Sequence, residues 1–173
     1  MVEVLHLAAV LPATVGLCCA VGDRRSRARS AVPAAAMLAA MVAMAIGLTA
    51  VSPLIWAALL VALGMFEAAG LRRMADMAVH ARRMRLHRAL GLVLSAALLV
   101  TGGHPGVGVA VGHPSHGAGA LLVVTLAGTA GYLAFTVWLV ARSLRQRAPI
   151  ISAVESTAMG LMAALMAVAA LAG

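Results

Sequence analysis

The basic residues of this chain fall into three short clusters separated by long apolar stretches. All thirteen are arginines, and they lie within residues 24–29, 72–88 and 142–147. The stretches between clusters are long enough for one or two membrane crossings each, because a crossing helix needs about 20 apolar residues. Cytoplasmic loops of membrane proteins collect Lys and Arg. The spacing therefore predicts a polytopic membrane protein with all three clusters on the cytoplasmic side.

The composition excludes a soluble domain. The chain is 64% hydrophobic and 10% charged, whereas a soluble domain carries about 25% charged residues. A net charge of +8 could indicate nucleic-acid binding, but no aromatic residues interleave the arginines, so we expect no nucleic acid. The predicted partner of these charges is the anionic inner leaflet of a lipid bilayer. The absence of lysine beside abundant alanine is typical of a high-GC bacterial genome, so we expect a bacterial plasma membrane.

The predicted fold is one all-α transmembrane domain over residues 1–173, with about six transmembrane helices and both termini extracytoplasmic. Apolar runs place the spans at about 2–21, 31–50, 54–70, 89–101, 118–141 and 150–171. Residues 71–88 fit either an interfacial helix or an early start of span four, and the sequence leaves both open. The connections predicted to face outward carry no arginine, which supports this topology.

Span five carries a face of small residues. Gly128 and Gly131, with Ala127 and Ala134, recur at helical spacing. Small residues let helix backbones approach closely and so favour helix association in lipid. The face therefore predicts other membrane subunits or a second copy of the chain as partners. The alternative interpretation is that alanine-rich spans are ordinary in high-GC genomes.

Histidines cluster on the predicted outer side of the membrane. His104, His113 and His116 fall within thirteen residues, and His6 lies at the outer end of span one. Neutral imidazole is a common ligand of zinc, copper and nickel. The cluster is a candidate metal site; the alternative interpretation is a solvated loop.

A second set of soft ligands lies among the arginines. Met77, His80, Met84 and His87 are spaced three, four and three residues apart, which puts them on one side of a helix. Thioethers and imidazoles suit Cu(I), but guanidinium groups nearby oppose cation binding. An interfacial segment with methionines dipping into lipid is the favoured interpretation.

Methionines also form one helical face in each of two spans. The two faces are Met37, Met41 and Met44 in span two, and Met159, Met162 and Met166 in span six. If the faces meet, they could form a copper-conducting track. Alternatively, methionine fills gaps between helices.

Two acids lie at membrane depth, Glu67 in span three and Glu155 in span six. An ionisable residue there is a functional hypothesis by default, because burying it unpaired is costly. Structural pairing is favoured, with Arg72 or Arg73 for Glu67 and with Arg147 for Glu155. Proton or cation handling is the alternative.

The Met-rich stretches 36–44 and 157–166 resemble the helices of a family of small actinobacterial multi-pass membrane proteins of unknown function. Helices of that family often begin with histidine, whereas this chain has Ser30-Ala31 and Glu155-Ser156 at the corresponding places. The resemblance implies a multi-pass helical fold and brings no activity.

No nucleophile with its base, phosphate-binding loop or dinucleotide motif is present in the sequence. We therefore expect no enzyme activity, no catalytic residues and no resident cofactor, with copper as the exception to test. The leading prediction is a non-catalytic accessory or self-associating membrane subunit. A copper-binding or copper-transport protein using the outer histidines and methionine faces is the alternative, and a proton-coupled small transporter using the two acids is another.

Overall fold

The computed structural model describes residues 2–22, 27–47, 51–72, 79–101, 116–146 and 149–172, and of residues 2, 3, 6, 27–29, 72 and 116–118 it describes the backbone only. Within these ranges the chain forms six helices and no strand. They are α1 (Val2–Gly22), α2 (Arg27–Ala45), α3 (Pro53–Arg72), α4 (Val79–Thr101), α5 (His116–Arg145) and α6 (Ile150–Ala172). The predicted all-α fold is thus confirmed.

The largest difference from the predicted spans is at the start of α4. This helix begins at Val79 instead of residue 89, so residues 79–88 continue span four, while 73–78 lie outside the described residues. Helix α2 starts at Arg27 and stops at Ala45, so both of its ends come earlier than in the predicted span 31–50. Gly47 follows α2 with a φ of 63°, a left-handed conformation that glycine adopts without strain and that commonly ends helices.

Four of the helices, among the described residues, are long and apolar enough to cross a membrane: α3, α4, α5 and α6. Shorter apolar segments occur in α1 and α2, at Leu7–Gly22 and Ser30–Ala45. Large apolar side chains such as Leu11, Phe66 and Ile150 are at least 70% exposed. A surface of this kind suits a lipid environment, where outward-facing apolar residues carry no penalty.

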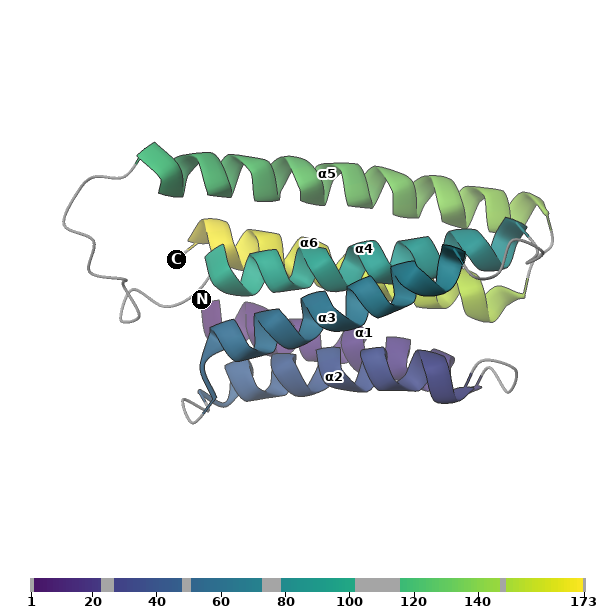
Figure 1. The fold of residues 1–173 in the computed structure, drawn as a ribbon, viewed down its shortest axis with the longest axis horizontal. Coiled ribbons are helices and arrows are strands. Elements are labelled where there is room, and N and C mark those ends of the chain that lie inside the picture. Colours follow the sequence, from purple (N-terminus) through teal and green to yellow (C-terminus); the bar gives the residue numbers. More distant parts are fainter. Residues whose placement is uncertain are drawn as a thin grey trace.

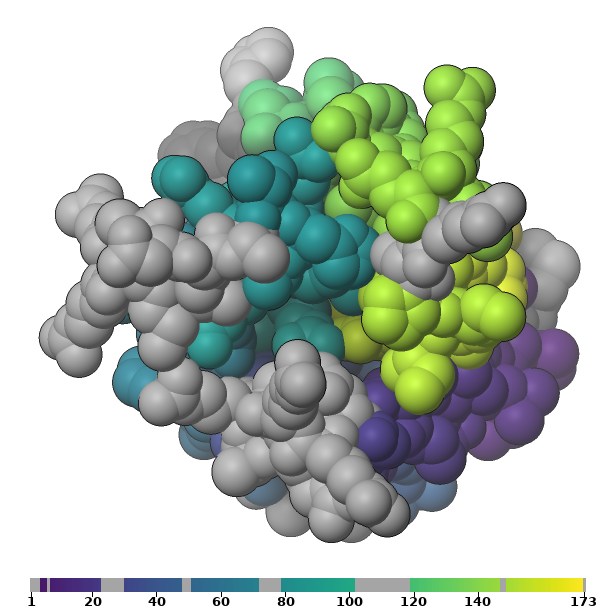
Figure 2. Space-filling model, turned by 90° about the vertical axis from the view of Figure 1, so that its right-hand side faces the viewer, coloured from purple at the N-terminus to yellow at the C-terminus, as the bar shows by residue number. Residues whose placement is uncertain are grey.

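The helices run alternately up and down in one bundle (Figure 1). The C-terminal ends of α1, α3 and α5 and the N-terminal ends of α2, α4 and α6 gather at one end, and both chain termini lie at the other (Figure 1). The described arginines all lie at this end, in the first ten residues of α2 and α4 or the last four of α3 and α5. We therefore call it the arginine end. Figure 2 looks onto it, where α4 meets α5 and α6.

Helices α4 and α6 form the centre of the bundle. More than half of the residues in the spanning part of each are buried, against about a fifth in α3 and α5. Helix α4 contacts α2, α3, α5 and α6, while α6 contacts α1, α4 and α5. Their side chains therefore decide what chemistry the interior can hold.

Candidate functional site: a buried ion pair and a methionine-lined cleft

An arginine and a glutamate form an ion pair inside the bundle. Arg88 Nε donates to Glu155 Oε1 at 2.5 Å and Arg88 Nη2 to Glu155 Oε2 at 2.8 Å. The same guanidinium donates from Nη1 to the Ser30 hydroxyl at 2.7 Å. The network joins α2, α4 and α6, because each helix supplies one of the three side chains.

The burial of this pair explains why its two side chains are joined by two parallel hydrogen bonds. Arg88 is the tenth residue of α4 and Glu155 the sixth of α6, and their side chains are only 13% and 6% exposed. Charges removed from water at such depth need partners that satisfy them by hydrogen bonds as well as by charge. The planar guanidinium supplies two parallel donors to the carboxylate, so each ion neutralises the other.

A cleft extends from this pair towards the middle of the bundle. Its wall comes from four helices: Pro12, Ala13, Gly16 and Leu17 of α1, Ser30, Pro33, Ala34 and Met37 of α2, Arg88 and Leu92 of α4, and Glu155, Met159 and Met162 of α6. The ion pair and Ser30 form its polar end, and the remaining wall is apolar apart from thioether sulfur. The cavity volume, for a water-sized sphere, is about 30 Å³.

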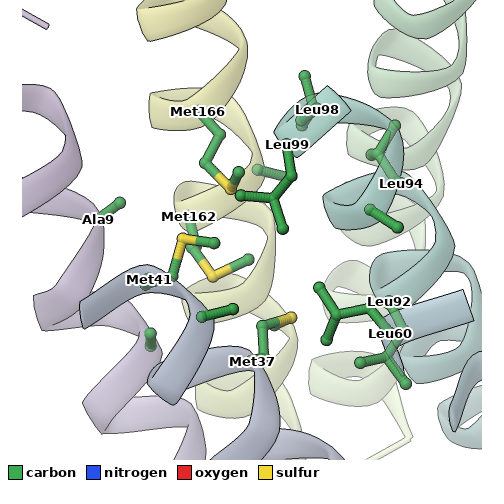
Figure 3. Packing of buried hydrophobic residues seen from close by; sticks show 14 of the residues in the cluster. Ala9, Met37, Met41, Leu60, Leu92, Leu94, Leu98, Leu99, Met162 and Met166 are labelled. Atoms are coloured by element: carbon green, nitrogen blue, oxygen red, sulfur yellow. The ribbon is translucent and has the colours of Figure 1, made fainter. Parts of the chain in front are cut away.

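The two methionine faces predicted from the sequence meet in the core. Buried Met37 and Met41 of α2 belong to the same cluster as buried Met159, Met162 and Met166 of α6. Their side chains enter one region between the helices, as Figure 3 shows for Met37, Met41, Met162 and Met166. The sixth residue of the two faces, Met44, is partly buried and packs against this cluster.

An imidazole is buried on the opposite side of α6, between α4 and α5. His87 is fully buried, and its Nε2 lies 2.8 Å from the Thr136 hydroxyl. Its ring stacks on Tyr132 at 4.7 Å between centroids and lies 5.8 Å from the ring of Phe135. Among the described residues His87 Nδ1 has no hydrogen-bond partner.

The aromatic series continues outward to the arginine end. Phe135 stacks on Trp138 at 5.8 Å, and the guanidinium carbons of Arg83 and Arg142 lie 5.0 and 5.6 Å from the Trp138 ring centroid. Arginine over an indole face gains cation–π attraction. Trp138 therefore connects the start of α4 to the end of α5.

The buried face of α5 is polar, which sequence reasoning missed. Residues 125, 129, 132, 136, 139 and 143 face inward, and all but Leu139 carry a hydroxyl. Three of the threonines donate to the carbonyl four residues earlier, so the helix itself satisfies these hydroxyls. The spacing of four, three, four, three and four residues was the available signal.

The small residues of span five lie on the other side of the helix. Ala127, Gly128, Gly131 and Ala134 are exposed, and a Cβ built on Gly131 would meet nothing within 4 Å. Within the chain, close helix approaches use other glycines instead. A Cβ on Gly91 of α4 would lie 2.7 Å from the Tyr132 hydroxyl and 2.9 Å from Met159 Cε.

Both acids that the sequence places at membrane depth are buried inside the bundle. Glu67 is 7% and Glu155 5% exposed. Glu155 pairs with Arg88, while the partner predicted for it, Arg147, lies outside the described residues. Glu67 also takes part in an interaction. The guanidinium of Arg85 lies against Gly70, one helical turn from Glu67.

The side chains of the predicted histidine site lie outside the described part of the chain. His104 and His113 lie outside the described residues, and the side chains of His6 and His116 are not described. Within the described ranges, no three His, Cys, Asp or Glu side chains are grouped as metal ligands would be.

The soft-ligand stripe among the arginines was misplaced. We expected Met84 and His87 at the membrane surface, but Met84 is 6% exposed and His87 is fully buried. They belong to the packed part of α4, where Met84 sulfur accepts a hydrogen bond from Ser156 at 3.5 Å. His80 is half-buried, and Met77 lies outside the described residues.

Fold and site together define an all-helical bundle with apolar walls and a charged, thioether-bearing interior. Comparison with protein-family models, with curated proteins and with solved structures found no match to this chain. The function is therefore inferred from the sequence and from the geometry of the bundle.

Proposed function

We propose that the chain is a polytopic protein of the bacterial plasma membrane, without catalytic activity of its own, which serves as an accessory or self-associating subunit. The four helices long and apolar enough to cross a membrane support membrane insertion. We place the arginine end in the cytoplasm and both termini outside. The described arginines near that end would face the anionic inner leaflet, which attracts basic residues.

The observation that carries the non-catalytic proposal is the pairing of the intramembrane charges. Glu155 is held by two hydrogen bonds from Arg88, and that arginine is held in turn by Ser30. A carboxylate fixed in this way links helices and is poorly placed to exchange protons with a substrate. The pairing therefore favours a structural role over proton-coupled transport.

Self-association is tested through the exposed small residues of α5. Purified protein in mild detergent is analysed by light scattering after size exclusion, as wild type and as Gly131→Leu. We expect an oligomer that the substitution weakens, since a large side chain keeps helix backbones apart. The matched control is Ala62→Leu, at an exposed position of α3. A monomer that also brings no membrane protein with it from native membranes would contradict the proposal.

Copper binding is the second candidate, and the meeting of the methionine faces of α2 and α6 favours it. Thioether sulfur is a soft ligand that selects Cu(I), and five buried methionines share one core cluster. Metal analysis of protein purified from copper-supplemented cells tests this candidate. Protein that carries no copper, together with unchanged copper tolerance of cells lacking the gene, would exclude it.

A further inference from the structure

Three of the core methionines line the same cleft. Met37 comes from α2, and Met159 and Met162 come from α6. The three residues are only 5%, 9% and 1% exposed. Met41 and Met166 belong to the same core cluster but do not line the cleft.

Neighbouring side chains restrict two of these methionines. The Ser95 hydroxyl, itself buried, donates to Met37 sulfur at 3.5 Å, and a thioether sulfur keeps a second lone pair for another partner. The methyl end of Met159 lies against Gly91 of α4, where a Cβ would stand 2.9 Å from it. Restricted side chains lose less rotamer freedom when they bind a ligand.

The size of the cavity selects the class of ligand. About 30 Å³ is room for roughly two water-sized bodies, given ~10–15 Å³ for each. A single metal ion fits in this space.

The charges around the cleft select a monovalent ion. Glu155 and Arg88 face the cleft as a neutral pair, and Met159 and Met162 follow Glu155 by four and seven residues, about 6 and 10 Å along the helix axis. No further charged side chain lines the cleft within the described residues. Three neutral thioethers cannot compensate a divalent charge in an apolar wall, but they suit a soft monovalent ion.

We propose that Met37, Met159 and Met162 form a three-thioether site for Cu(I) inside the cleft. The site rests on the second candidate function, that the protein binds copper, and names the residues that would do so. It does not depend on the outer histidines.

The test measures Cu(I) transfer to purified protein in detergent, under anaerobic conditions, from a coloured Cu(I)-chelator complex. We expect wild type to take up about one Cu(I) per chain with sulfur neighbours in X-ray absorption. The triple variant Met37→Leu, Met159→Leu, Met162→Leu is expected to lose binding. Each single variant removes a direct ligand, so we expect it to weaken binding by at least the roughly 10-fold that loss of an outer-shell partner costs. Leucine nearly preserves the side-chain volume, so the packing is retained.

Two controls separate this site from a general effect of core methionines. Met41→Leu with Met166→Leu removes buried thioethers outside the cleft, and Met65→Leu removes one that is 66% exposed. Both are expected to bind Cu(I) as wild type does. Helix content and melting temperature of every variant show that it is folded.

The outcomes distinguish the site from the candidate function. Equal Cu(I) binding by wild type and a folded triple variant would overturn the site while leaving copper binding in place elsewhere. Absence of Cu(I) uptake by wild type would overturn both. Loss of binding in the Met41 and Met166 control as well would also overturn the assignment to the cleft.

Discussion

The guanidinium of Arg88 holds the carboxylate of Glu155 through two hydrogen bonds of 2.5 and 2.8 Å, across 67 positions of the sequence. This ion pair connects the two central helices, α4 and α6, at the polar end of the cleft. Its burial means that neither ion can be removed without leaving the other uncompensated.

Removal of Glu155 is therefore expected to destabilise the protein strongly. Glu155→Ala leaves the Arg88 charge buried, which costs about 3–5 kcal/mol. Ser30→Ala removes a single hydrogen bond and leaves the ion pair in place, so we expect only about 1 kcal/mol. Both are measured as changes in the free energy of unfolding in detergent. Equal effects of the two variants would contradict the importance assigned to the pair.

Gly91 is a point where three helices approach closely, and this gives a second prediction. Gly91→Ala places a methyl group 2.7 Å from the Tyr132 hydroxyl and 2.9 Å from Met159 Cε. We expect a loss of about 1–3 kcal/mol from overpacking. Gly119→Ala is the matched control, because a Cβ at this exposed position of α5 meets nothing within 4 Å and alanine favours the helix. We expect the melting temperature to fall for Gly91→Ala and to stay unchanged or rise for the control.

How much of this could be predicted depends on whether an interaction is local. The spans were predictable because a membrane helix shows itself as a run of apolar residues. The start of α4 was not, because Arg82, Arg83 and Arg85 interrupt that run. The signal that survives is the periodicity of Met84, His87, Gly91 and Ser95, which continues the buried face of α4 through the arginines.

The partner of Glu155 is an interaction that the sequence could not predict. An arginine close in sequence was the reasonable choice, but Arg88 reaches it only because α4 packs against α6. The periodicity of a helix shows which side chains share one face. It does not show against which other helix that face packs. The meeting of the methionine faces was likewise proposed from the sequence. It became visible only because α2 and α6 both pack against α1 and α4 and so share one core.

The hydrogen bond between His87 and Thr136 leads to a third prediction. Thr136→Val leaves His87 Nε2 buried without its partner, which costs about 1–3 kcal/mol. Adding His87→Phe removes the imidazole nitrogens but keeps a ring to stack on Tyr132. We therefore expect the double variant to be more stable than Thr136→Val alone. Unfolding free energies of the two single variants and the double variant give the coupling directly; simple additivity would argue against the hydrogen bond.

The membrane orientation gives the last prediction, and cysteine accessibility tests it. The two cysteines, Cys18 and Cys19, are free and are first replaced by alanine. Single cysteines are then placed at Arg82, Arg145 and Leu54, all of them exposed. The first two lie on α4 and α5 towards the arginine end, whereas Leu54 is in the first turn of α3 at the opposite end. A membrane-impermeant maleimide should label position 54 in intact cells and positions 82 and 145 only after the membrane is opened. In the proposed topology an even number of crossings separates any two arginine clusters, so positions 82 and 145 lie on the same side. Labelling of these two positions from opposite sides of the membrane would mean an odd number of crossings between them. The six-span topology would then be wrong.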